Sequence, residues 1–177
     1  FDLRLRQTAV PDPALVQLYR QYQQLVSDAN LLENYPRVPL PDDLAFTGSE
    51  DCRRCHEYEY DEWSAKAHAD ALNVLKKVGS DRDPECVICH VVAMEYEGGY
   101  VAETKTPHLK DVGCEACHGP GSEHAQTNGV KLTRPPQRTC LDCHTPEKST
   151  GYAGHEAEYL QKIVHWREPA TGSNVKE

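Results

Sequence analysis

The clearest hydrophobic pattern in the chain lies near its N-terminus. Apolar residues recur there at alternating steps of three and four, which places one apolar stripe along a helix. The stripe consists of Leu15, Leu18, Tyr22, Leu25, Ala29 and Leu32. Asp12 followed by Pro13 is typical of an N-cap and the first helical position. Tyr35-Pro36 should end this helix, and the proline-rich stretch 35–48 is expected to be an extended linker.

The apolar stripe has two possible partners. It can pack against the chain's own domain, as most amphipathic helices do. Its heptad spacing also suits a seam against another chain. The sequence leaves both interpretations open.

Further along, the pattern predicts short helices separated by loops. A segment rich in Ala, Glu, Lys and Leu runs from about Glu57 to Val78 and should form a helix that stops at Gly79. A second helix is expected from about Glu156 to His165, and Val91–Thr104 is compatible with a small β-hairpin. The expected fold is therefore mainly α.

All eight cysteines belong to one repeated motif, Cys-x-x-Cys-His. The four copies are Cys52-Arg53-Arg54-Cys55-His56, Cys86-Val87-Ile88-Cys89-His90, Cys114-Glu115-Ala116-Cys117-His118 and Cys140-Leu141-Asp142-Cys143-His144. This is the attachment signal for c-type haem: two thiols bind one porphyrin, and the following imidazole takes an axial position on the iron. Zinc knuckles or redox dithiols also use Cys-x-x-Cys, but they do not need a histidine after every copy. We expect four covalently bound haem c groups.

The composition agrees with a fold that is built around cofactors. The 177 residues are enough for one domain but include only two Phe and one Met, beside 12 Pro and 11 Gly. A conventional apolar core would be thin. Four porphyrins supply the missing apolar bulk, so we expect the haem-free chain to be unfolded or molten.

Charge and hydropathy narrow the function classes. The formal net charge is −9, and the haem propionates make the holoprotein more acidic still. No basic stripe suggests nucleic-acid binding, and an acidic surface favours basic partner proteins. No apolar run approaches about 18 residues, so no membrane span is expected. Haem c is attached outside the cytoplasm; since Phe1-Asp2-Leu3-Arg4 does not resemble a signal peptide, an export signal is expected to be removed or to lie outside this numbering.

The positions of the cysteines and histidines divide the chain into two regions. Residues 1–48 contain neither Cys nor His and form the helical arm and linker, whereas 49–177 hold all four motifs. Five histidines remain outside the motifs as candidate second iron ligands: His68, His108, His124, His155 and His165. Met94, the only methionine, lies four residues after His90 and is interpreted as packing. Mostly bis-His ligation is therefore expected, with low reduction potentials.

Local distances restrict which histidine serves which iron. His68 follows His56 by twelve residues, a rise of about 18 Å if the segment is helical. It should therefore ligate a haem other than its own. The turn Gly119-Pro120-Gly121 is too short to bring His124 comfortably round the haem of His118, so His124 should also serve a neighbour.

Several stretches resemble the cytochrome c-554 family of tetrahaem proteins over about 49–168. The matching residues are Tyr60, Trp63 and His68-Ala69-Asp70-Ala71, then Gly113 to His124 around the third motif, then Thr145-Pro146-Glu147-Lys148-Ser149 and Ile163-Val164-His165. The resemblance implies a helical, haem-packed fold and electron transfer. It also implies that His68 serves the third haem, His108 the first and His124 the fourth. His165, His155 or no residue would then complete the second, on His90, and some family members keep one iron five-coordinate.

The expected function is single-electron transfer along closely packed haems between redox partner proteins. The unit could be a shuttle, an attached relay domain or a subunit of a conductive filament, since related tetrahaem proteins polymerise. The alternatives are an enzyme acting on a small nitrogen oxide or peroxide at an open iron, and an interaction module that depends on residues 1–34. The protein is expected to be periplasmic or extracellular.

Overall fold

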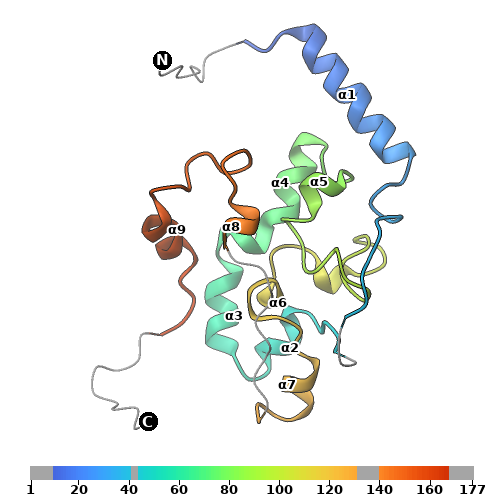
Figure 1. Ribbon diagram of the computed structural model, residues 1–177. Helices are drawn as coiled ribbons and strands as arrows, with labels where there is room; N and C mark the ends of the chain where they lie inside the picture. Colours follow the sequence, from blue (N-terminus) through green and yellow to red (C-terminus); the bar gives the residue numbers. More distant parts are fainter. Residues whose placement is uncertain (1–9, 41–43, 131–139, 168–177) are drawn as a thin grey trace.

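The computed structural model describes residues 10–40, 44–130 and 140–167 as a set of short helices joined by long loops (Figure 1). Among these residues, β-pairing is limited to isolated bridges, so the mainly α expectation is confirmed. The helices, of which α1 is by far the longest, are α1 Pro13–Asp28, α2 Ser49–Arg53, α3 Glu57–Ser64, η2 Ala67–Asp70, α4 Ala71–Val78, α5 Pro84–Val87, η3 Pro107–Leu109, α6 Cys114–His118, α7 Ser122–Gln126, α8 Cys140–Cys143 and α9 Glu156–Ile163.

Helix α1 lies to one side of the other helices and is fixed there by polar contacts (Figure 1). The Asp12 side chain caps it by accepting from the backbone N–H of Ala14 at 2.8 Å, as the sequence predicted. The Tyr22 hydroxyl donates to Asp83 at 2.9 Å, and the Gln23 amide donates to the Val78 carbonyl at 2.7 Å. These contacts hold α1 against the turn between α4 and α5.

The predicted apolar stripe is divided between two environments. Leu32 is 2% exposed and belongs to the core, but it lies beyond the end of α1. Leu15, Leu18 and Leu25 are 61–68% exposed. Tyr22 of the stripe faces the chain's own body through its bond to Asp83, beside Val26, which is buried, and Tyr19, which is bonded to Ser80. The three leucines are therefore the part of the stripe that α1 leaves exposed.

Residues 35–40 of the expected linker are tied to the loop that follows the second motif. Val38 donates to the Glu95 carbonyl at 2.9 Å and accepts from Glu97 at 2.8 Å. The Arg37 guanidinium donates to the carbonyls of Leu32 and Tyr100, both at 3.2 Å. The expected hairpin over 91–104 is not formed; single bridges and turns occupy that loop instead.

The single helix expected from Glu57 to Val78 is wrong, because the backbone breaks after Ser64. Lys66 is extended, and His68 lies in the short 3-10 helix η2 before α4 begins. Tertiary bonds replace the helical ones at the break: Val112 donates to the His68 carbonyl at 3.0 Å and accepts from the Trp63 indole at 3.0 Å. The predicted end at Gly79 is confirmed, with a left-handed φ of 74°.

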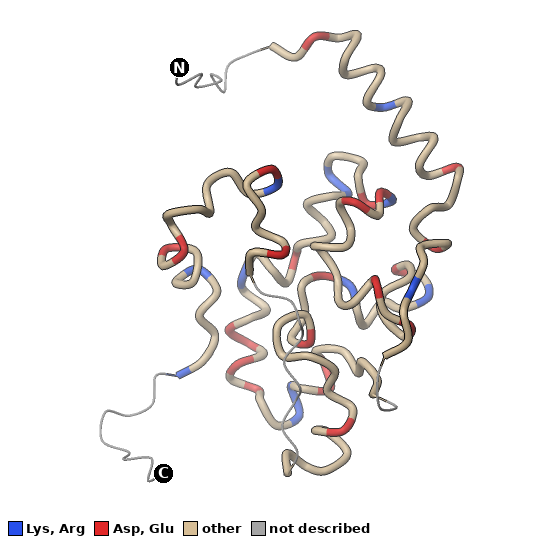
Figure 2. The backbone as a smooth tube through the Cα atoms, in the orientation of Figure 1, with Lys and Arg blue, Asp and Glu red and all other residues tan. Residues whose placement is uncertain are grey.

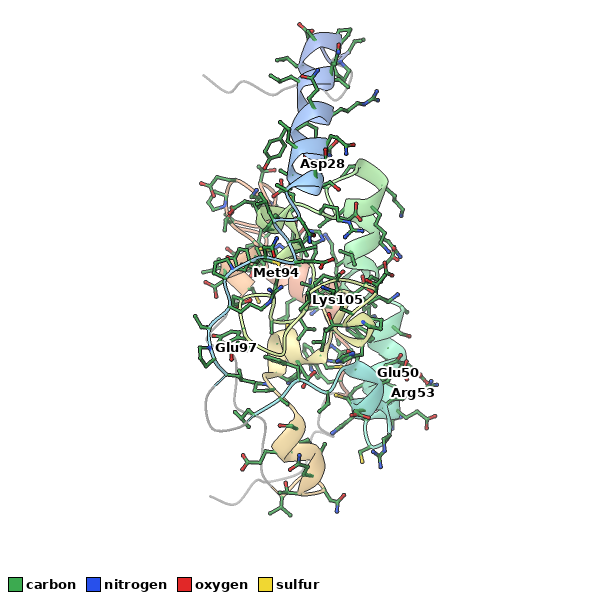
Figure 3. The ribbon with its side chains drawn as sticks, turned by 90° about the vertical axis from the view of Figure 1, so that its right-hand side faces the viewer. Asp28, Glu50, Arg53, Met94, Glu97 and Lys105 are labelled. Carbon is green, nitrogen blue, oxygen red and sulfur yellow. The ribbon has the colours of Figure 1, made fainter. Side chains whose placement is uncertain are left out.

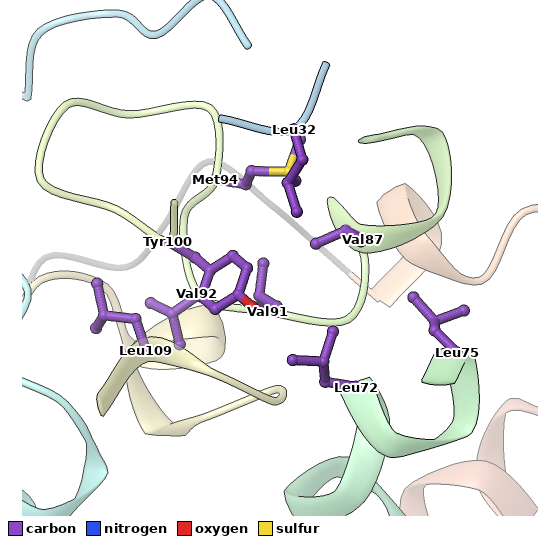
Figure 4. Close-up of a cluster of buried hydrophobic side chains, with 9 residues drawn as sticks. All are labelled: Leu32, Leu72, Leu75, Val87, Val91, Val92, Met94, Tyr100 and Leu109. Atoms are coloured by element: carbon purple, nitrogen blue, oxygen red, sulfur yellow. The ribbon is translucent and has the colours of Figure 1, made fainter. Parts of the chain in front are cut away.

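A small apolar core surrounds the second motif (Figure 4). Met94 is fully buried in it, which confirms the interpretation of this residue as packing. The cluster consists of Leu32, Leu72, Leu75, Val87, Val91, Val92, Met94, Tyr100 and Leu109. It draws on the N-terminal arm, on α4 and on the loop after α5, and it holds these segments around His90.

Candidate functional site

Each Cys-x-x-Cys-His motif is carried by its own short helix. Helices α6 and α8 begin at the first cysteine of motifs three and four, whereas α2 and α5 begin a few residues before motifs one and two. Helix α5 starts with Pro84 after the N-cap Asp83, whose carboxylate accepts from Glu85 at 3.0 Å. The eight cysteines, all of which lie in the described residues, form no disulfide, so each thiol can attach to a porphyrin.

The first and third motifs lie next to each other. The Cys52 thiol is hydrogen-bonded to Cys114, which lowers the pKa of Cys114 to about 6 and raises the pKa of Cys52. The Cys114 backbone N–H also donates to the Ser49 hydroxyl at the start of α2, at 3.1 Å. Two haem attachment points are therefore in direct contact.

The motif histidines form three ring pairs with spare histidines. The ring centroids are 6.1 Å apart for His56 and His124, 6.3 Å for His144 and His68, and 6.1 Å for His118 and His165. A metal–imidazole bond is about 2 Å long and the ring centre lies beyond the nitrogen, so two rings on opposite sides of one iron should have centroids about 6 Å apart. The three pairs have the separation that an iron between them requires.

Hydrogen bonds at Nδ1 orient several of these rings. The Nδ1 of His165 lies 2.8 Å from the Ile163 carbonyl, and that of His90 lies 2.7 Å from the Ala71 carbonyl. The Nδ1 of His144 lies 3.0 Å from the Ser149 hydroxyl. An imidazole that donates from Nδ1 keeps Nε2 as its lone-pair nitrogen, which is the usual arrangement of a metal-ligating histidine. The residues therefore fit haem iron.

The ring contacts differ from the pairing that the resemblance implied. His68 lies beside His144 of the fourth motif and not beside the third, because the helix break at Lys66 reorients it. His124, which α7 carries, lies beside His56 of the first motif and not beside the fourth. His165 lies beside His118 of the third motif and not beside the second.

Two spare histidines have no ring partner among the described residues. His108 is exposed on η3, where its carbonyl oxygen, Cβ and ring Cδ2 all lie against Gly48. His155 is exposed at the start of α9, and its Nδ1 lies 3.2 Å from Glu158. Neither residue is therefore placed as a second ligand in this structure.

The second motif differs from the other three. Within the part of the chain that the structure describes, no spare histidine ring is paired with His90. The neighbouring Val87 and Val91 are buried in the core cluster. His90 is thus held firmly through Ala71 but has no imidazole opposite it.

Tyrosines around His144 were not recognised from the sequence. The Tyr152 ring stacks on His144 with centroids 4.7 Å apart, and Tyr159 approaches it edge-on at 5.5 Å. Arg167 lies over the Tyr58 ring of α3 at 4.1 Å and so fixes the segment that carries His165. These contacts cannot be recognised from residue spacing in the sequence, because each one depends on how the loops fold in three dimensions.

Comparisons with known proteins find similar cytochromes. A family model described as cytochrome c554 and c-prime matches residues 51–119. Cytochrome c-554 of Nitrosomonas europaea is 30% identical over 155 residues, which cover 68% of this chain and 66% of that protein. The C-type polyheme cytochrome OmcB of Geobacter sulfurreducens is 34% identical over 67 residues, which cover 35% of this chain but only 9% of OmcB.

The fold is similar to a solved structure as well. The reduced state of cytochrome c554 from Nitrosomonas europaea matches with a TM-score of 0.51 and 24% identity, over 70% of this chain and 86% of that one. The chain belongs to the cytochrome c554 family and is a multihaem c-type cytochrome whose four motifs bind haem c.

Proposed function

We propose that this protein is an electron carrier in which three of the four irons have two histidine ligands. The observation that carries the proposal is the set of three ring pairs, His56 with His124, His144 with His68, and His118 with His165. Each haem supplies an iron that gains or loses one electron. Two histidines on an iron leave no position for a substrate and favour low potentials.

The sites are close enough to exchange electrons with one another. The Cys52 and Cys114 thiols are in contact, which joins sites one and three. The His68 ring centroid lies 6.3 Å from that of His144 in site four, and the nearby Ala71 carbonyl lies 2.7 Å from Nδ1 of His90 in site two. Burial and then the charges of His144, His90 and His165 lower the pKa of His68. We propose the order one, three, four, two for electron movement through the protein, with 49–177 as the functional unit.

A reductive titration tests this function. We expect the holoprotein to take up four electrons per chain, reversibly and mostly at low potential, without added substrate. Spectroelectrochemistry gives both the electron count and the midpoints. Irreversible uptake, or a majority of haems at the high potentials typical of His/Met ligation, would contradict the proposal.

Partner proteins are proposed to dock through electrostatic attraction. Acidic residues crowd α3, with Glu57, Glu59, Asp61 and Glu62 in one short helix beside the first motif (Figure 2). With a net charge of −9, the surface suits a basic redox partner. No helix in the described ranges is long and apolar enough to cross a membrane. We propose that the protein works in the periplasm or outside the cell, where haem c is attached.

The outer side of α1 is proposed as a contact between copies of this chain. The helix projects beyond the body of the molecule (Figure 3), and Leu15, Leu18 and Leu25 are exposed along it. Their spacing matches one side of a two-helix seam. Such pairing would extend the haem series beyond one subunit, and filament formation is a further extension of the same idea.

Charged substitutions at the exposed leucines of α1 test whether copies of the chain associate through this helix. The double substitution Leu18→Glu with Leu25→Glu should lower the assembled fraction at least about tenfold, because each change removes an apolar contact worth about 1.5–3 kcal/mol. Light scattering on the holoprotein measures the assembly state. The control is Gln17→Glu with Gln21→Glu, which adds the same charge to the same helix at exposed polar positions. If the parent protein is monomeric, or if the leucine variant assembles as the control does, the arm has no assembly role.

A further inference from the structure

Glu115 is a buried carboxylate inside the third haem-binding motif. It is 3% exposed, whereas the corresponding residue of the first motif, Arg53, is exposed. A glutamate is rarely buried to this degree unless its charge is satisfied. Its burial therefore points to a specific task.

Three backbone N–H groups satisfy this carboxylate. Oε1 accepts from Gly121 at 2.7 Å and Oε2 accepts from Gly48 at 2.8 Å, while the N–H of Thr47 lies 3.0 Å from both oxygens. Hydrogen bonds to an ionised acceptor are about twice as strong as neutral ones. One side chain thus joins two loops that are far apart in the sequence.

Both loops lead to the ligands of the first site. Thr47 and Gly48 immediately precede α2, which carries Cys52 and leads to His56. Gly121 is the N-cap residue of α7, which carries His124. Glu115 belongs to the third motif. The two segments that it joins lead to His56 and His124, which form the first ring pair.

Other contacts reinforce the same junction. Ala45 donates to the Ser122 hydroxyl at 2.9 Å, and Ser122 donates back to the Ala45 carbonyl at 3.2 Å. The space is tight, because a Cβ added at Gly121 would meet Glu115 Oε1 at 3.2 Å. Gly48 adopts a left-handed φ of 87°, which favours glycine at this position.

We propose that Glu115 is a positioning residue that sets His124 opposite His56 and so couples the geometry of the first site to the third motif. The proposal rests on the bis-His assignment of the first site given above. It differs from a local supporting role, in which loss of Glu115 would disturb the haem attached at its own motif, on His118.

The substitution Glu115→Gln tests the proposal in the holoprotein. Glutamine keeps the shape of the side chain but is uncharged, and one of its two terminal atoms becomes an NH2 donor. That NH2 group cannot accept from the backbone N–H groups of Thr47, Gly48 and Gly121, so at least one hydrogen bond to a charged oxygen is lost. This loss should shift the equilibrium between ligated and free His124 by roughly 10- to 100-fold. Since carbon monoxide must displace His124, its apparent affinity for the reduced haem on His56 should rise by the same factor. Ser122→Ala should give a smaller change in the same direction.

Reference variants show which site has changed. His124→Ala gives the spectrum of an open first site, and His165→Ala gives that of an open third site. Glu57→Gln is the matched control, since Glu57 follows His56 directly but is exposed. All variants should retain four haems by intact mass.

Each outcome has a distinct meaning. If His124→Ala opens no site, the bis-His assignment is wrong. If it opens one but Glu115→Gln and Ser122→Ala bind carbon monoxide as the parent does, the positioning role is wrong. If Glu115→Gln reproduces the His165→Ala spectrum instead, Glu115 supports only its own motif.

Discussion

Replacing His68 with methionine should raise the reduction potential of the haem attached at Cys140 and Cys143. In the structure, the ring centroids of His68 and His144 are 6.3 Å apart, and His144 is the motif histidine of that haem. Methionine in place of an axial histidine stabilises the reduced iron. The expected increase is on the order of 0.1 V, a fraction of the ~0.8 V range that axial ligands span.

The same variant separates the observed pairing from the one that the resemblance implied. If His68 served the third motif, the potential of the haem on His118 would rise instead. Potentiometric titration followed by paramagnetic NMR of the individual haems identifies which one shifts. His155→Met is the matched control, because His155 is exposed and has no ring partner in the described structure; its potentials should stay at the parent values. A shift at the haem on His118 or His56 would refute the pairing with His144.

The attachment sites follow from the sequence because the motif is local. Five consecutive residues supply both thiols and one ligand, so no tertiary information is needed to find Cys52, Cys86, Cys114 and Cys140 or the residues that follow them. The N-cap at Asp12 and the helix stop at Gly79 are local in the same sense. The N-cap and the helix end were predicted correctly for that reason.

The second ligands do not follow from local patterns. The rise of an unbroken helix led to the expectation that His68 serves another haem, but the helix breaks at Lys66. What holds the break is remote: Val112 bonds to the His68 carbonyl and Asp111 bonds to the Leu72 backbone N–H at 2.8 Å. Helix propensity cannot anticipate bonds that come from another loop.

The junction at Glu115 was missed for a related reason. Within the motif its position is one of the two variable ones, so the spacing rule assigns it no role. Its three N–H donors come from residues 47, 48 and 121, and only the folded chain brings them together. A buried charge of this kind becomes recognisable once burial and hydrogen bonding are known.

Carbon monoxide should bind rapidly to one haem per chain in the reduced protein, at the site of His90. The other three motif histidines each have a second imidazole with its ring centroid 6.1–6.3 Å away, so at the proposed bis-His sites carbon monoxide would first have to displace a ligand. In the described structure His90 has no such partner, while its own ring is fixed through the Ala71 carbonyl. Flash photolysis should therefore give one fast recombination phase, with an amplitude of one haem.

Variants that lack one haem-attachment motif show which haem gives the fast recombination phase. A chain with Cys86→Ala and Cys89→Ala should carry three haems by intact mass and lose the fast phase, whereas Cys140→Ala with Cys143→Ala should carry three haems and keep it. The open position is also where the enzymatic alternative must act, because a nitrogen oxide or a peroxide needs a free iron coordination site. If the protein only transfers electrons, the reduced protein should consume neither the nitrogen oxide nor the peroxide catalytically. A fast phase that survives loss of the second motif would place the open iron elsewhere, and steady consumption of either substrate that ends with that motif would identify an enzyme at His90.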